Sequence, residues 1–145
     1  MKIEEKTLVL SKRLGWPILV FLVYWDAFVT YTRGGREGNP LWKLIVDAYG
    51  SNALWLLAVL VLAIFYLVTK AAGWYEKRFE HFPQGEEIVL TSIVIAFGTY
   101  DFYITFLLPY FGFLGSRSHY YIIPVLIIPV LAYNIWIEYR RRTGK

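Results

Sequence analysis

The chain has 145 residues, of which 57% are hydrophobic and 18% are charged, and it contains no cysteine. A soluble domain typically has about 45–50% apolar and about 25% charged residues, so lipid is expected to cover part of this surface. The lack of cysteine excludes disulfides, thiolate metal sites and thiol nucleophiles. The net charge of +4 lies in segments that flank apolar runs. It forms no basic face, so we expect no nucleic-acid partner.

Four apolar runs approach the roughly 20 residues that a helix needs to cross a bilayer. They lie at residues 14–31, 53–69, 88–108 and 120–137. We therefore predict an all-α integral membrane protein, a four-transmembrane-helix bundle that forms one membrane domain over residues 1–145. Glu4 and Glu5 precede the first run and no small-x-small cleavage site follows it, so we expect this run to be retained as a signal anchor.

The distribution of basic residues predicts the orientation of these spans. Eleven of the 15 Lys and Arg residues lie in the N-terminal, central and C-terminal segments, and the other four lie in the first and third connections. We therefore expect a multi-pass protein of the cell membrane with both termini and the central loop in the cytoplasm. The scarcity of Gln, Asn and Met is typical of thermophilic proteins.

Two connecting segments have amphipathic patterns. Residues 73–82 place aromatic side chains on one helical face and charges on another, which predicts a short helix lying in the cytoplasmic interface and ending at Pro83. Residues 40–49 have a similar pattern on the outer side, either leading into the second span or lying flat before it. Lys70 is expected to extend towards the cytoplasmic interface, and Glu86 to favour the start of the third span.

An internal correspondence appears at an offset of 75 residues. Residues 24–31 align with residues 99–106, and both segments contain Asp-x-x-x-Thr between aromatic residues. The pattern indicates a duplicated two-helix hairpin whose copies are related by a pseudo-two-fold along the membrane normal.

The aspartates of this pattern are the most conspicuous polar residues in the apolar runs. Asp26 and Asp101 fall at similar depths below the outer surface, and Thr30 and Thr105 follow them by one helical turn. A carboxylate in hydrocarbon is costly, by about 2.5–3.5 kcal/mol at the centre of a helix. One interpretation is a capped or buried turn satisfied by water and by threonine. The other is a polar chamber, open to the outer side, that binds a proton, cation or amine.

The loop after the first span leads back to the same side. Glycines at Gly34, Gly35 and Gly38 allow Glu37 and Asn39 to fold in close to Asp26. Asn39 and Pro40 also fit the N-cap and first position of a following helix. In the fourth span, two prolines predict a kink: Pro124 and Pro129.

The segment from Asp26 through Thr30 to Glu37-Gly38-Asn39-Pro40, followed by an apolar helix ending in Lys70, resembles a family of small archaeal and bacterial membrane proteins. This family is catalogued as a domain of unknown function, and its pattern is Asp-x-x-x-Thr, a glycine-containing loop and Glu-x-Asn-Pro. The resemblance covers residues 24–70. The second half repeats the Asp and Thr without Glu-x-Asn-Pro. The resemblance implies membrane architecture and no particular activity.

Three functions are compatible with these residues. The first, which we favour, is an accessory or structural subunit of a larger membrane assembly, with a protein partner or second copies in the membrane. The second is a small oligomeric carrier or channel that uses Asp26 and Asp101. The third and weakest is an intramembrane enzyme acting on a lipid-like substrate, because His81 and His119 lie outside the spans and no nucleophile motif is present. We expect no enzyme activity, no cofactor and no bound metal.

Overall fold

The computed structural model describes residues 9–32, 40–80, 84–107 and 122–143, and the statements below concern these residues. The elements in this part of the chain are all helical. They are α1 (Lys12–Thr32), α2 (Pro40–Tyr49), α3 (Ala53–Tyr75), α4 (Gly85–Phe102) and α6 (Ile122–Thr143). Two π-helical segments, Glu76–Glu80 and Tyr103–Leu107, extend α3 and α4 directly.

Four of the helices are long and apolar enough to cross a membrane. With their extensions they contain 21 to 27 residues, at Lys12–Thr32, Ala53–Phe79, Gly85–Leu107 and Ile122–Thr143. At 1.5 Å per residue they are about 32–40 Å long, which exceeds the roughly 30 Å thickness of a hydrocarbon core. The predicted all-α fold with four long apolar helices is confirmed, and its insertion in a membrane stays a prediction.

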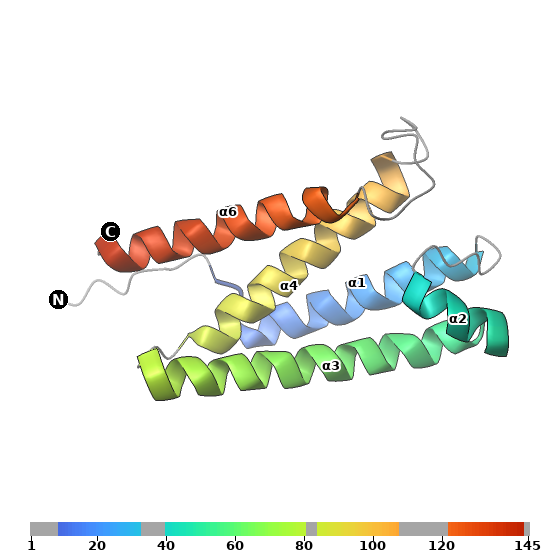
Figure 1. The fold of residues 1–145 in the computed structure, drawn as a ribbon, viewed down its shortest axis with the longest axis horizontal. Coiled ribbons are helices and arrows are strands. Elements are labelled where there is room, and N and C mark those ends of the chain that lie inside the picture. Colours follow the sequence, from blue (N-terminus) through green and yellow to red (C-terminus); the bar gives the residue numbers. More distant parts are fainter. Residues whose placement is uncertain (1–8, 33–39, 81–83, 108–121, 144–145) are drawn as a thin grey trace.

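The long helices alternate in direction along the chain. α1 and α4 begin, and α3 and α6 end, at the left-hand end of Figure 1. We call this the ion-paired end, for the salt bridges described below. The opposite end, where α2 connects α1 to α3, is the α2 end. α4 crosses the bundle and packs against α1, α3 and α6, whereas α6 packs mainly against α4.

Packing between α1 and α4 fixes the centre of the bundle. Leu19 of α1 and Leu90 of α4 have no exposed surface, and Val23 is 4% exposed. Gly15 allows this close approach, because a Cβ at position 15 would lie 2.6 Å from Cδ2 of Leu90. The absence of a side chain at Gly15 therefore determines how closely α1 and α4 pack.

The first connection between helices is a short amphipathic helix followed by a turn. Val46 of α2 is buried in the main core with Leu54 and Leu57 of α3. Gly50 ends α2 with a φ of 81°, a conformation that L side chains rarely adopt. α2 is thus separate from α3 and folds against it.

The segment over residues 73–82 differs from the expected separate interfacial helix. Residues up to Tyr75 belong to α3, and residues 76–80 continue it as a π-helical segment without a break. The tight contacts of Gly73 with Glu86 and of Gly85 with Glu76 hold this extension against α4. Packing against a neighbouring helix therefore continues α3 where the sequence pattern indicated an end.

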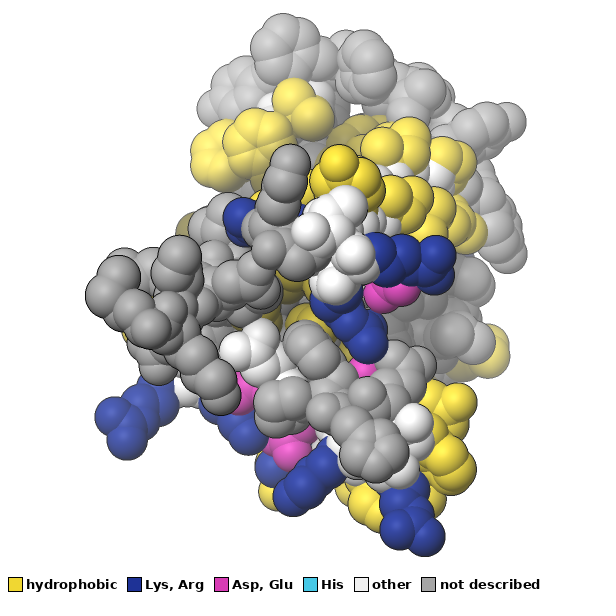
Figure 2. Space-filling view, turned by 90° about the vertical axis from the view of Figure 1, so that its left-hand side faces the viewer, with side chains coloured by type: hydrophobic (Ala, Val, Ile, Leu, Met, Phe, Trp, Pro, Cys, Tyr) yellow, Lys and Arg dark blue, Asp and Glu magenta, His cyan; other side chains and the backbone are white. Residues whose placement is uncertain are grey.

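The outer surface of the four long helices is rich in exposed apolar side chains, including Phe21, Leu56, Leu67, Ile128 and Ile135. Figure 2 looks onto the ion-paired end, where Lys and Arg side chains gather with acidic side chains between them and apolar surface beside them. This arrangement is compatible with a membrane protein.

Candidate functional site

The most deeply buried acidic side chain in the described structure belongs to Asp101, near the end of α4. Asp101 is 4% exposed, and neither of its carboxyl oxygens has a hydrogen-bond partner among the described residues. The π-helical segment Tyr103–Leu107 begins two residues later. Such segments are frequent at functional sites in helices. A buried carboxyl group without partners is costly, which makes Asp101 the leading candidate for a functional residue.

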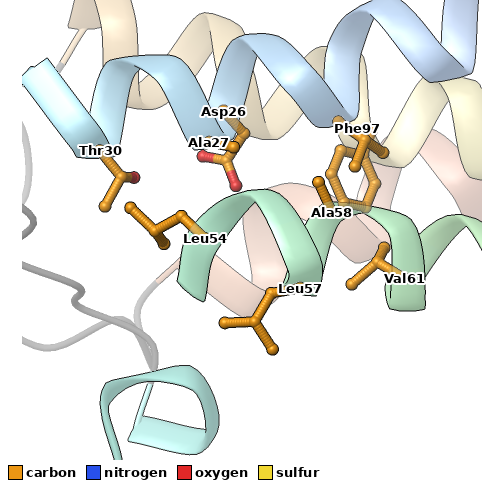
Figure 3. Close-up of a pocket in the computed structure, with 9 residues that line it drawn as sticks. Asp26, Ala27, Thr30, Leu54, Leu57, Ala58, Val61 and Phe97 are labelled. Carbon is orange, nitrogen blue, oxygen red and sulfur yellow. The ribbon is translucent and has the colours of Figure 1, made fainter. Parts of the chain in front are cut away.

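Asp26 lies on α1 and points towards the first turns of α3 (Figure 3). Together with Thr30 it provides the polar side chains that line a small cavity of about 50 Å³. The rest of the lining is apolar, with one aromatic ring from α4: Val23, Ala27, Leu54, Leu57, Ala58, Val61 and Phe97. Cavities with polar groups hold water when they exceed about 10–15 Å³ by this measure, so this one accommodates a few water molecules.

The two aspartates are close enough to interact electrostatically across the α1–α4 contact. Thr105 follows Asp101 by four residues, and its buried hydroxyl oxygen also lacks a hydrogen-bond partner within the described part of the chain. The α2 half of the bundle thus holds all four residues of the repeated Asp-x-x-x-Thr pattern. Asp26 and Thr30 share the cavity, and Asp101 with Thr105 lies on the neighbouring helix.

Several predicted site residues fall elsewhere. Five of them lie outside the described residues: Gly34, Gly35, Glu37, Gly38 and Asn39. Pro40 is the first residue of α2, in agreement with the expected helix start. Pro124 and Pro129 both lie within α6, which is one helix from Ile122 to Thr143.

A second group of polar contacts lies at the ion-paired end. Oε2 of Glu86 on α4 accepts hydrogen bonds from Lys12 of α1, at 3.1 Å, and from Lys70 of α3, at 3.0 Å. On α6, Arg141 lies 4.0 Å from Glu76. The sequence suggested a separate role for each of Lys70 and Glu86. Their pairing could have been expected, because opposite charges at the same depth of neighbouring helices pair with each other.

A third polar contact joins α4 to α6. Asn134 donates hydrogen bonds to Oγ of Ser92, at 3.1 Å, and to the carbonyl oxygen of Val130, at 2.8 Å. A side-chain hydrogen bond therefore joins α4 to α6 within their apolar runs. Hydroxyl and amide side chains inside apolar runs signal such contacts between helices.

The chemistry that these groups support is limited. Among the described residues, no three His, Cys, Asp or Glu side chains gather so that they could hold a metal ion. The two carboxyl groups and the nearby hydroxyl groups are oxygen ligands that can bind a proton or a small cation.

Comparisons of the chain with protein families, with curated proteins and with solved structures found no match.

Proposed function

We propose that this protein is a small membrane carrier or channel that binds a proton or small cation at Asp26 and Asp101. The observation that carries the proposal is the buried carboxyl group of Asp101, whose two oxygens have no hydrogen-bond partner in the described structure. A structural carboxyl group is normally paired or hydrogen-bonded when it is buried. A buried carboxyl group that has no hydrogen-bond partner and lies near a second carboxyl group is instead suited to binding and releasing a proton or a cation.

The position of the site supports transport rather than structural capping. α4 contacts each of the other three long helices, so a change of charge on Asp101 acts on the centre of the bundle. Ion pairs and close glycine contacts hold α1, α3 and α4 together at one end. The cavity and both aspartates lie in the other half of the same helices, away from these contacts.

Flux measurements in proteoliposomes test this proposal. We expect purified protein to carry a pH change, or Na⁺, Ca²⁺ or methylammonium, across the vesicle membrane, and an Asp26→Asn, Asp101→Asn double variant to carry none. Asp47→Asn is the matched control, because Asp47 is an exposed aspartate of α2 at the same end of the bundle. A double variant that transports as well as the parent protein would remove both aspartates from the mechanism.

A second proposal is the accessory or structural subunit of a larger membrane assembly. α6 supports it, because this helix packs mainly against α4. Only 11% of the residues in its most apolar stretch of 18 residues are buried within the described structure. In a complex, a neighbouring subunit would cover part of this face. Purification from native membranes in mild detergent, followed by mass spectrometry, tests this proposal. A protein that runs alone at the size of one chain would contradict it.

A further inference from the structure

We infer that the species bound at Asp26 and Asp101 is the proton, and that it reaches the site from the α2 end. This inference rests on the carrier proposal above and narrows it to one substrate and one direction of access. It depends on three observations: the size of the cavity, the number of oxygen atoms around it, and the apolar packing that separates it from the ion-paired end.

The cavity is too small for an organic amine larger than methylammonium. Its volume of about 50 Å³ compares with about 150 Å³ for an engineered apolar cavity that binds benzene. It accommodates a few water molecules, or one ion that has lost most of its water. The ligands compatible with this volume are therefore protons, carried by water, and small inorganic cations.

The side-chain oxygen atoms of the described lining are fewer than the ligands that Ca²⁺ or Mg²⁺ takes. Ca²⁺ takes six to eight oxygen ligands, and Mg²⁺ requires nearly octahedral coordination. The polar side chains that line the cavity are Asp26 and Thr30, whereas Asp101 is not part of the lining. Among the described side chains, a cation in the cavity would therefore meet one carboxyl group and one hydroxyl group. A proton requires one oxygen atom at a time, and each aspartate provides two.

The groups around Asp101 also favour transfer of a proton between acids. Among the described residues, the charged group that acts on Asp101 is Asp26, on α1. Tyr100 and Tyr103 are the titratable residues next to it in the sequence of its own helix. On the α6 side, Ile122 and Leu126 pack in one apolar cluster with Tyr103 and Ile104. A proton bound by one aspartate would relieve the repulsion between the two carboxyl groups.

Access to the site is one-sided. Asp26 is six residues from the end of α1 at Thr32, which is about 9 Å along the helix, and fourteen residues from its start at Lys12, which is about 21 Å. The longer path is filled by Leu19, Val23 and Leu90, which are 0–4% exposed. The cavity lies in the last turns of α1 and the first turns of α3. Protons therefore exchange with water at the α2 end in this conformation.

The flux experiment that separates the two proposals uses proteoliposomes with an internal pH dye. A potassium gradient with valinomycin drives proton uptake, and parallel vesicles contain radioactive Na⁺, Ca²⁺ or methylammonium. We expect proton flux in the parent protein and in Asp47→Asn, and flux at the level of protein-free vesicles in Asp101→Asn. Flux of another cation without protons, abolished by Asp101→Asn, would overturn the inference and keep the carrier proposal. No flux of any of the four species would overturn both.

Thiol labelling tests the direction of access. The chain has no cysteine, so single cysteines can be introduced without a reactive background. We expect Thr30→Cys to react with a membrane-impermeant maleimide added on the α2 side of oriented vesicles, and Leu19→Cys and Leu90→Cys to react from neither side. Labelling after unfolding in detergent checks that each thiol is present. Reaction of Leu19→Cys or Leu90→Cys from the ion-paired side as fast as Thr30→Cys from the α2 side would overturn the one-sided access.

Discussion

Gly73 of α3 lies directly against the side chain of Glu86 on α4, so that a Cβ at position 73 would overlap the Glu86 Cγ. A second contact of this kind lies nearby, with the roles of the two helices exchanged: a Cβ on Gly85 of α4 would lie 2.6 Å from Cβ and Cγ of Glu76, which follows α3. The same Glu86 carboxylate accepts the hydrogen bonds from Lys12 and Lys70. The missing side chain at Gly73 therefore allows one carboxylate to bind three helices together.

The variant Gly73→Ala tests this arrangement. We expect it to destabilise the protein by about 1–3 kcal/mol, because the added methyl group forces Glu86 to move and lengthens its bonds to the two lysines. Thermal unfolding in detergent measures the change. The matched control is Gly98→Ala on α4, where the added Cβ would meet only Cδ1 of Leu22, at 3.9 Å. This control should be neutral or stabilising by about 0.5–1 kcal/mol.

Replacing Asp101 with leucine should raise stability while it removes transport. The carboxyl group is buried without hydrogen bonds in the described structure, and removing such a group is expected to stabilise the fold by about 1–3 kcal/mol. Transport requires the group that the variant lacks, so proton flux should fall to the level of empty vesicles. A lower unfolding temperature for Asp101→Leu would show that the carboxyl group has a structural partner.

Thr69→Val provides the comparison for this variant. Thr69 is 1% exposed on α3, and its hydroxyl oxygen likewise has no hydrogen-bond partner among the described residues. It does not line the cavity. We expect a small rise in unfolding temperature and unchanged proton flux. Reduced flux in Thr69→Val would indicate that the polar path extends beyond the two aspartates.

Filling the cavity should block the site without unfolding the protein. Ala58 of α3 lines the cavity and is 4% exposed, so Ala58→Val places two additional methyl groups next to Asp26. We expect lower proton flux and an unfolding temperature equal to or above that of the parent, because the methyl groups enter the cavity without overlapping packed side chains. Ala63→Val adds the same groups at an exposed position of α3 and should change neither quantity.

The bond between Asn134 and Ser92 holds α6 to α4. Asn134→Ala should destabilise this contact by about 0.6 kcal/mol, the average for hydrogen bonds between membrane helices, and by at most about 1.7 kcal/mol. Ser92→Ala should have a similar effect, and the double variant should be little worse than either one. Fully additive effects in this double-mutant cycle, measured by unfolding, would show that the two side chains do not interact.

The sequence predicted the long helices well because apolar run length alone determines them. The run at residues 53–69 carries no charge, and α3 begins at its first residue, Ala53. The interest in Asp26 and Asp101 also came from sequence, since a charge inside an apolar run is conspicuous without any structure. That Asp101 has no hydrogen-bond partner among the described residues could not be predicted, because it depends on which side chains of the neighbouring helices lie at its depth.

The continuation of α3 past residue 73 shows a limit of pattern reasoning. Aromatic and charged residues on opposite faces fit a helix on a membrane surface and a helix packed against another helix equally well. The contacts of Gly73 and Gly85 with two glutamates show that the segment packs against α4, and its position at a membrane surface stays a prediction. A single sequence does not show which helices will be neighbours, so it could not assign Lys12, Lys70 and Glu86 to one group.

The close contact of Gly15 with Leu90 and the two glutamate–glycine contacts all lie in the half of the molecule where α1 and α4 begin. At the opposite end, ring contacts of Trp55 with Tyr24 and Tyr31 join α1 to α3 beside the cavity. Among the described residues no ion pair joins these two helices there, so hydrogen–deuterium exchange should be faster in the last turns of α1 and the first turns of α3 than at the ion-paired end. Because Glu86 holds α1, α3 and α4 together, Gly73→Ala should alter exchange at the α2 end as well as beside the substitution.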